Sequence, residues 1–153
     1  MFQKRSEMGQ ALVMIALAVV VLFALAALLI DVGRIYSDRQ NAQNAADSAA
    51  LAAALARVKS QTQAKGPAVT AGLARARSNG YGNDGNSKVK ISICSENRIS
   101  CEGMPVDANP ADYLQVKITS TIPLTFAKIF GRKSFTNKVT AVVVTYPSIS
   151  LIK

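Results

Sequence analysis

The sequence predicts an α+β protein with one long N-terminal helix, whose first half spans a membrane, and a small antiparallel β-sheet packed on its outer half. Three observations predict this fold class. Residues 11–30 form an unbroken apolar run, residues 31–65 continue it with a helix-favouring composition, and residues 66–153 contain short segments of alternating polar and apolar residues. The 153 residues therefore have room for one anchor and one small domain.

The apolar run, ALVMIALAVVVLFALAALLI, has no charge over twenty positions and stops at Asp31. At about 1.5 Å per residue it extends about 30 Å, the thickness of a bilayer's hydrocarbon core. We expect a transmembrane helix over residues 11–30, because in lipid the backbone must satisfy its own hydrogen bonds. A cleaved signal peptide and a buried core helix are alternatives. However, a signal has a shorter apolar core, and a core helix this apolar needs a larger domain around it.

Charges on either side of the span predict its orientation. Lys4 and Arg5 precede it against Glu7 in a leader of residues 1–10, whereas the first four charged residues after it sum to zero. This balance favours a cytoplasmic leader and an extracytoplasmic bulk of the chain. Cys94 and Cys101 are the two cysteines, and such a close pair suits a disulfide in an oxidising compartment, with two unpaired thiols as the alternative.

Beyond the membrane the helix should continue over residues 31–65, which contain one glycine and no proline. Gly66-Pro67 should end it, and a second helical piece should follow at residues 68–78. Arg34 and Asp38 can pair on an exposed face. Small residues at steps of three and four form a stripe that can pack neighbouring helices or receive this chain's own sheet. We take as its assembly face Gly33, Ala42, Ala45, Ala46, Ala49, Ala52, Ala53 and Ala56.

Residues 66–153 should form the small β-rich domain. Residues 88–94 and 112–120 alternate polar and apolar positions, and residues 138–147 are rich in β-branched side chains, so all three read as strands. Residues 125–130 read as one or two helical turns ended by Gly131. The apolar residues expected to anchor these turns are Phe126, Ile129 and Phe130.

The net charge of +9 lies wholly in the distal part of the chain. Residues 57–153 carry fourteen Lys and Arg against five Asp and Glu, whereas residues 1–56 carry four of each. Such a domain can dock anionic lipid, an acidic surface polymer or an acidic partner, or its charge can serve solubility alone. Nucleic acid is not an expected partner, because no recognised binding motif is present and the aromatic residues are not interleaved with the basic ones.

Catalysis finds little support in the sequence. There is no histidine, the usual general base at neutral pH, and no Ser-x-x-Lys or Gly-x-Ser-x-Gly motif. Asp107 and Asp112 flank Pro110, a pattern more typical of a turn than of acid–base chemistry or a calcium site. We expect no enzyme, cofactor or metal site.

One segment of the sequence is similar to a known family. The stretch GQALVMIALAVVVLFALAALLIDVGRIYSDRQNAQNAADSAALAAALA, residues 9–56, resembles the TadE/TadG-like proteins of the Tad (tight adherence, Flp-type) pilus system. The Asp-Val-Gly-Arg segment at 31–34 and Gln-Asn-Ala-Ala-Asp at 43–47 carry the resemblance. The later run of residues 116–144 is a looser match. The chain resembles a short member, without the von Willebrand-like domain of the larger ones.

The resemblance implies a pilin-like or pseudopilin-like subunit, held in the bacterial inner membrane or built into a cell-surface filament. Its partners would be pilus or pilus-assembly subunits, including copies of itself, together with membrane lipid. Pilin precursors are cut after a glycine, which here would separate Gly9 from Gln10. The Glu common at the fifth mature position is replaced by Met14.

Two functions follow. In the first, the chain is a structural subunit of a pilus or its assembly machine that acts through helix–helix contacts. In the second, it is a monomeric anchored module whose basic domain docks a partner or surface polymer. Asp31 and Arg34, at the membrane edge, would pair with each other or between neighbouring helices, or only mark the interface. A type II secretion pseudopilin is a weaker third reading.

Overall fold

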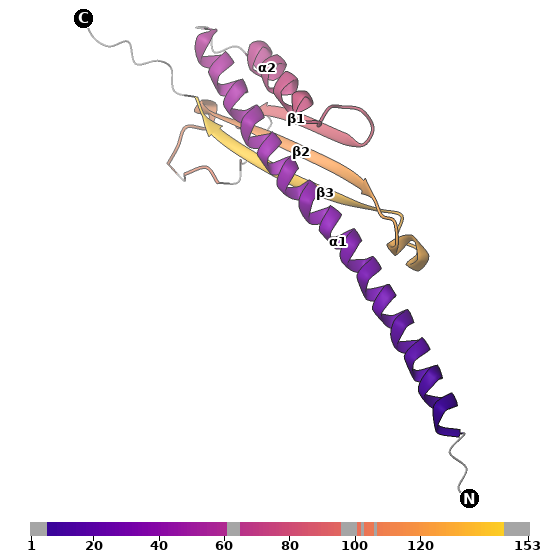
Figure 1. Cartoon of the computed structure of the whole chain (residues 1–153). Helices are drawn as coiled ribbons and strands as arrows, with labels where there is room; N and C mark the ends of the chain where they lie inside the picture. Colours follow the sequence, from indigo (N-terminus) through magenta and orange to yellow (C-terminus); the bar gives the residue numbers. More distant parts are fainter. Residues whose placement is uncertain (1–5, 61–64, 96–100, 102, 106, 146–153) are drawn as a thin grey trace, which may run out of the picture.

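A single helix forms the spine of the molecule (Figure 1). The computed structural model describes residues 6–60, 65–95, 101, 103–105 and 107–145, and helix α1 runs from Ser6 to Lys59. The predicted long N-terminal helix is confirmed. It ends at Lys59, however, before the predicted Lys65.

Helix α2 (Lys65–Ser78) begins where the sequence suggested a break. Gly66 and Pro67 lie in its first turn, so they start this helix instead of ending α1. Proline fits there, because the first N–H groups of a helix have no intrahelical acceptor and proline lacks that donor. The second helix thus begins three residues earlier than expected.

Three antiparallel strands in the order β1-β2-β3 form the sheet. They are β1 (Ser87–Ile93), β2 (Tyr113–Pro123) and β3 (Ser134–Val144), with the short 3₁₀ helix η2 (Pro110–Asp112) before β2. A second 3₁₀ helix, η3 (Ala127–Phe130), lies in the β2–β3 hairpin. The predicted α+β fold is confirmed, although the hairpin is longer than the sequence indicated, since β2 extends to Pro123 and β3 starts at Ser134.

Both helices cover the same face of the sheet, and the first half of α1 projects away from it (Figure 1). Alternation along the strands directs apolar side chains toward the helices, with Val89, Ile118 and Val139 aligned across the three strands. These residues pack on the buried alanines of α1 in one continuous core. The alternating pattern thus predicted which face of β1 and of β2 is buried, whereas β3 was recognised by its β-branched residues.

Close approach of the two helices depends on Gly72 of α2. A Cβ added at Gly72 would lie 2.4 Å from Ile91 Cδ1, 3.1 Å from Ala53 Cβ and 3.2 Å from the Ala49 carbonyl oxygen. Small residues therefore set the distance between α1 and α2, and the sheet closes over the same point.

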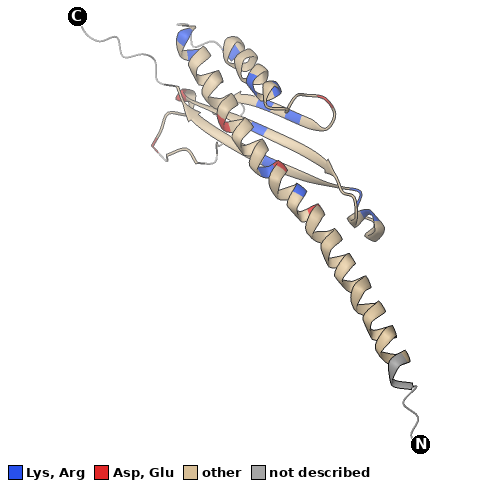
Figure 2. Cartoon of the chain, viewed as in Figure 1, with Lys and Arg blue, Asp and Glu red and all other residues tan. Residues whose placement is uncertain are grey.

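Charge separates the molecule into two parts (Figure 2). The projecting half of α1 has no Lys, Arg, Asp or Glu from Gly9 to Ile30, whereas basic residues are spread over the domain. On the face of the sheet turned away from the helices lie four exposed lysines, which are Lys88, Lys90, Lys117 and Lys138. Lys90 is directly opposite Lys117 in the ladder.

Candidate functional site

The projecting half of α1 exposes its apolar side chains on all sides. Leu12, Phe23 and Leu29 are each at least 70% exposed, and no other described element covers them. Among the described residues there is one helix, α1, that is both long enough and apolar enough to cross a membrane. Because an exposed apolar run of this length is stable in lipid, the chain is membrane-anchored through this half.

Asp31, the first charged residue after the apolar run, binds the β2–β3 hairpin. Its carboxylate accepts backbone N–H groups from Thr125 at 2.9 Å, Phe126 at 2.9 Å and Ala127 at 2.7 Å. The N–H of Thr125 is the main cause that lowers the pKa of Asp31, although desolvation acts in the opposite direction. The carboxylate is therefore held ionised against the start of η3.

Arg34 reinforces the same contact. Its guanidinium donates to the hydroxyl of Thr125 at 2.7 Å, and its charge contributes to the lowered pKa of Asp31. The sequence suggested that Asp31 and Arg34 pair with each other or across neighbouring helices, or only mark the membrane interface. In the structure, both side chains instead hydrogen-bond to the hairpin of their own chain.

The turn held by Asp31 differs from the expectation in one respect. Residues 127–130 do form a helical turn ended by Gly131, which has a left-handed φ of 82°. Ile129 and Phe130, predicted as apolar anchors, are instead 82% and 74% exposed, and Phe126 is half-buried. The anchoring is done by the backbone N–H groups at the start of the turn, which leaves its tip free to project.

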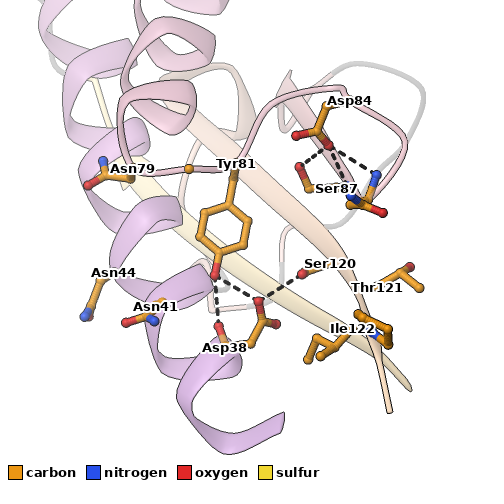
Figure 3. A pocket seen from close by; sticks show the side chains of 13 residues that line it. Asp38, Asn41, Asn44, Asn79, Tyr81, Asp84, Ser87, Ser120, Thr121 and Ile122 are labelled. Atoms are coloured by element: carbon orange, nitrogen blue, oxygen red, sulfur yellow. Dashed lines mark hydrogen bonds between the residues drawn. The ribbon is translucent and has the colours of Figure 1, made fainter. Parts of the chain in front are cut away.

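Asp38 joins four parts of the fold (Figure 3). Its Oδ1 accepts the hydroxyls of Tyr81 at 3.1 Å and Ser120 at 3.0 Å, and its Oδ2 accepts the Asn137 amide at 2.8 Å. The predicted exposed pair with Arg34 is therefore wrong, because Asp38 faces the sheet. Burial, followed by the charge of Asp38, raises the pKa of Tyr81.

Beside this network lies a polar groove of about 610 Å³ (Figure 3). Its lining residues include Asn41 and Asn44 of α1, together with Asn79 and Asp84 of the segment between α2 and β1. Asp84 is occupied in shaping its own loop, where its Oδ1 accepts the N–H of Ser87 at 3.0 Å, and this bond is the main cause of its lowered pKa. Among the described residues, no group of three His, Cys, Asp or Glu could hold a metal ion.

Arg57 fastens the far end of α1 to the sheet. It is only 4% exposed and donates to the Thr145 hydroxyl at 2.9 Å and to the Ala111 carbonyl at 2.9 Å. Thr145 in turn donates to the Asp112 carbonyl at 2.9 Å. This cation therefore joins α1 to the start of β2 and the end of β3.

Most of the predicted alanine stripe lies in the chain's own core. Ala42, Ala46, Ala49 and Ala53 are fully buried, Ala45 is 1% exposed, and Ala52 and Ala56 are half-buried. Gly33 is exposed, with no atom near the position of a Cβ. The stripe was expected either to pack neighbouring helices or to receive the chain's own sheet. The structure displays the second use, because inward-facing methyl groups let β2, β3 and α2 approach α1 closely.

The remaining predicted sites are local. Cys94 and Cys101 form a disulfide, with Cα atoms 5.7 Å apart. Gly9 and Gln10 lie exposed near the start of α1. Asp107 and Asp112 belong to the connection around η2. Glu7 and Arg5 carry no described side chain, so the charge balance of the leader lies outside the described residues.

Sequence reasoning missed the roles of Asp38 and Arg57. A signal was available for Asp38, because it follows Asp31 by seven residues and precedes Ala42 by four, which places it on the same face of the helix. A charged residue on the buried face of a helix needs polar partners from the element packed on it. The partners themselves come from distant segments and carry no such signal.

Comparison with known proteins identifies α1. The family described as Tad, putative Flp pilus-assembly TadE/G-like, matches residues 9–57, from the start of the apolar half to Arg57. No curated protein and no solved structure matches the chain. The matched segment contains the anchor together with Asp31, Arg34, Asp38 and Arg57. Over the helix that anchors it and forms the spine of its domain, the chain is therefore similar to the TadE/G-like family.

Proposed function

We propose that the chain is a non-enzymatic structural subunit of a Tad-type pilus or of its assembly machinery. It would cross the bacterial inner membrane once, with a cytoplasmic N-terminus and the sheet domain outside. The observation that carries the proposal is the continuity of α1, which is both apolar anchor and spine of the domain. Such a helix transmits contacts made inside the membrane directly to the domain outside it.

The surface proposed for assembly is the side of α1 opposite the alanine stripe. Leu51 and Leu55 are 65% and 56% exposed there, and Tyr36 is 70% exposed nearer the membrane. At 100° per residue, Leu51 points directly away from the buried Ala42. The alanine stripe is occupied by the chain's own sheet, so helix–helix contacts between subunits would use this outer side and the apolar half below it.

A shallow groove adjoins these residues. It has a volume of about 470 Å³ and lies between α1 and α2, with Leu51 and Leu55 on one wall and Ala71 and Arg75 on the other. Its alanine-rich floor permits close approach of another helix. A neighbouring subunit seated there would cover the exposed leucines of α1.

One observation favours the second function, an anchored binding module. Lys90 and Lys117 stand opposite each other on the open face of the sheet, with Lys88 and Lys138 close by in the ladder. Like charges at directly opposed positions destabilise a sheet, and an anionic partner would relieve that repulsion. A groove of about 460 Å³ beside Lys88 and Lys90 extends this face.

Photo-crosslinking in the native membrane tests both functions. A photoreactive amino acid would replace Leu51 on the outer side of α1 or, as the matched exposed position, Lys117 on the sheet. Adducts with a second copy or with pilus subunits from position 51, and none from 117, are expected for assembly through α1. Adducts from position 117 alone would overturn this proposal and support the binding module.

Processing of the leader is a separate proposal. Cleavage between Gly9 and Gln10 would release residues 1–9 and leave the apolar half of α1 at the new N-terminus. Intact-mass analysis of membrane and sheared-surface fractions tests it. A shortened species in the sheared fraction indicates a processed filament subunit, whereas a full-length species confined to the membrane indicates a permanently anchored assembly protein.

A further inference from the structure

The turn between β2 and β3 exposes two large apolar side chains on a well-fixed backbone. Ile129 and Phe130 are 82% and 74% exposed, as noted above. The backbone beneath them is closed by bonds from the N–H of Gly131 to the Lys128 carbonyl at 3.0 Å and from the N–H of Arg132 to the Ala127 carbonyl at 3.1 Å. Two neighbouring apolar side chains held outward by a closed turn indicate a contact with an apolar medium.

The turn lies at the level where the membrane begins. Asp31 is the first residue after the apolar run, and it binds the N–H groups of Thr125, Phe126 and Ala127 within 2.9 Å. The start of the turn is therefore held beside the last apolar residues of the span. In Figure 1, η3 lies at the end of the sheet nearest the projecting half of α1.

The charges around the turn complement anionic lipid. Lys128, Arg132 and Lys133 are all exposed, and Asp112 is the last acidic residue in the sequence. Three cations beside two apolar side chains are the combination that binds a bilayer interface, where acyl chains receive the apolar groups and phosphates receive the cations. A second protein chain would need its own acidic groups to match the turn.

We propose that this hairpin tip, residues 125–133, is a second membrane contact of the protein. Ile129 and Phe130 enter the boundary between headgroups and acyl chains, and the three cations bind lipid phosphates. Asp31 and Arg34 hold the tip at that depth. With one helix through the bilayer and a second contact beside it, the domain cannot rotate freely about α1, so its outer side faces a fixed direction along the membrane.

Depth-dependent quenching tests this proposal in the full chain. The sequence contains no tryptophan, so Phe130→Trp introduces a single reporter. The variant would be placed as one copy per nanodisc in bilayers containing anionic phosphatidylglycerol, with or without bromine on the lipid acyl chains. We expect blue-shifted emission and loss of most of it in brominated lipid. Leu51→Trp is the matched control, since it is exposed on α1 twenty residues, or about 30 Å, beyond Asp31 and should not be quenched.

Two further variants separate depth from charge. Replacing Lys128, Arg132 and Lys133 together by glutamine should reduce the quenching of the Phe130→Trp reporter in anionic discs. Asp31→Ala should reduce it in every lipid, because the tip is then released. Circular dichroism would establish that each variant is folded. A folded Phe130→Trp variant that brominated lipid does not quench overturns the proposal, including when emission is blue-shifted, since the tip is then covered by protein.

Discussion

Replacing Asp38 by alanine should loosen the whole domain, because one carboxylate joins α1 to both long strands and to the loop after α2. The variant removes the acceptor of three side-chain donors, on Tyr81, Ser120 and Asn137. These residues are 8%, 6% and 5% exposed, so all three donors belong to the packed interior of the domain. The loss should therefore appear as global destabilisation and not as local fraying.

The magnitude follows from the burial of each donor. Hydrogen bonds to a charged group contribute about 1.5–3 kcal/mol each when no water replaces them. Tyr81 and Ser120 line the polar groove beside Asp38, so water replaces the lost acceptor and each of these two bonds contributes only about 0.5 kcal/mol. Asn137 does not line that groove and its bond contributes about 2 kcal/mol, so we expect Asp38→Ala to lower the free energy of unfolding by about 3 kcal/mol.

Urea-dependent pulse proteolysis of the full chain in nanodiscs would measure the change. With a denaturant slope of about 1.5 kcal/mol per M, the midpoint should fall by about 2 M. Asp47→Ala is the matched control: it lies exposed on the same helix, gains the same helix propensity, and should change stability by less than about 0.5 kcal/mol. Equal midpoints for the two variants would refute the reasoning.

Three further predictions concern other contacts of the helices. Arg57→Met keeps the apolar stem but leaves the Ala111 carbonyl without its donor, and should lower the free energy of unfolding by about 2–4 kcal/mol in the same assay. Gly72→Ala should destabilise by about 1 kcal/mol, because crowding outweighs the gain in helix propensity, whereas Gly66→Ala in open space should not destabilise. Folding lowers the pKa of Asp31 from 3.8. The contribution of its carboxylate to the free energy of unfolding is therefore complete at neutral pH and declines as the pH falls below about 4. Over that range the difference in urea midpoint between wild type and Asp31→Asn should shrink. A difference that stays constant down to pH 2 would contradict this assignment.

Periodicity in the sequence predicted the helix, the first two strands and their buried faces, and β-branched content predicted the third strand. The alanine stripe and the alternating strands each bury one face, and the two faces meet in the structure. Boundaries were less accurate, because Gly66-Pro67 suits the start of a helix as well as its end. The helix pattern alone does not choose between these two readings.

The polar contacts were predicted poorly for a physical reason. The partners of Asp31 lie more than ninety residues away in the sequence, and they are backbone N–H groups, which every residue except proline supplies. No side-chain pattern marks such partners. Ile129 and Phe130 were expected to anchor their turn for a related reason, since apolar side chains that pack inside a protein and those that stay exposed look alike in sequence.

The residues matched by the family model, 9–57, include the charged side chains of α1 that hold the sheet. Charged side chains of α1 bind backbone groups of the sheet: Asp31 accepts three N–H groups, and Arg57 donates to the Ala111 carbonyl. A backbone partner makes no demand on the side chain that accompanies it, so strands of many sequences can dock on the same helix. The helix, by contrast, must keep its acid at the membrane edge, its small residues against the sheet and its cation at the far end. We therefore expect the charges and small residues of α1 to determine how the sheet docks, whereas the outer face of the sheet takes no part in that contact.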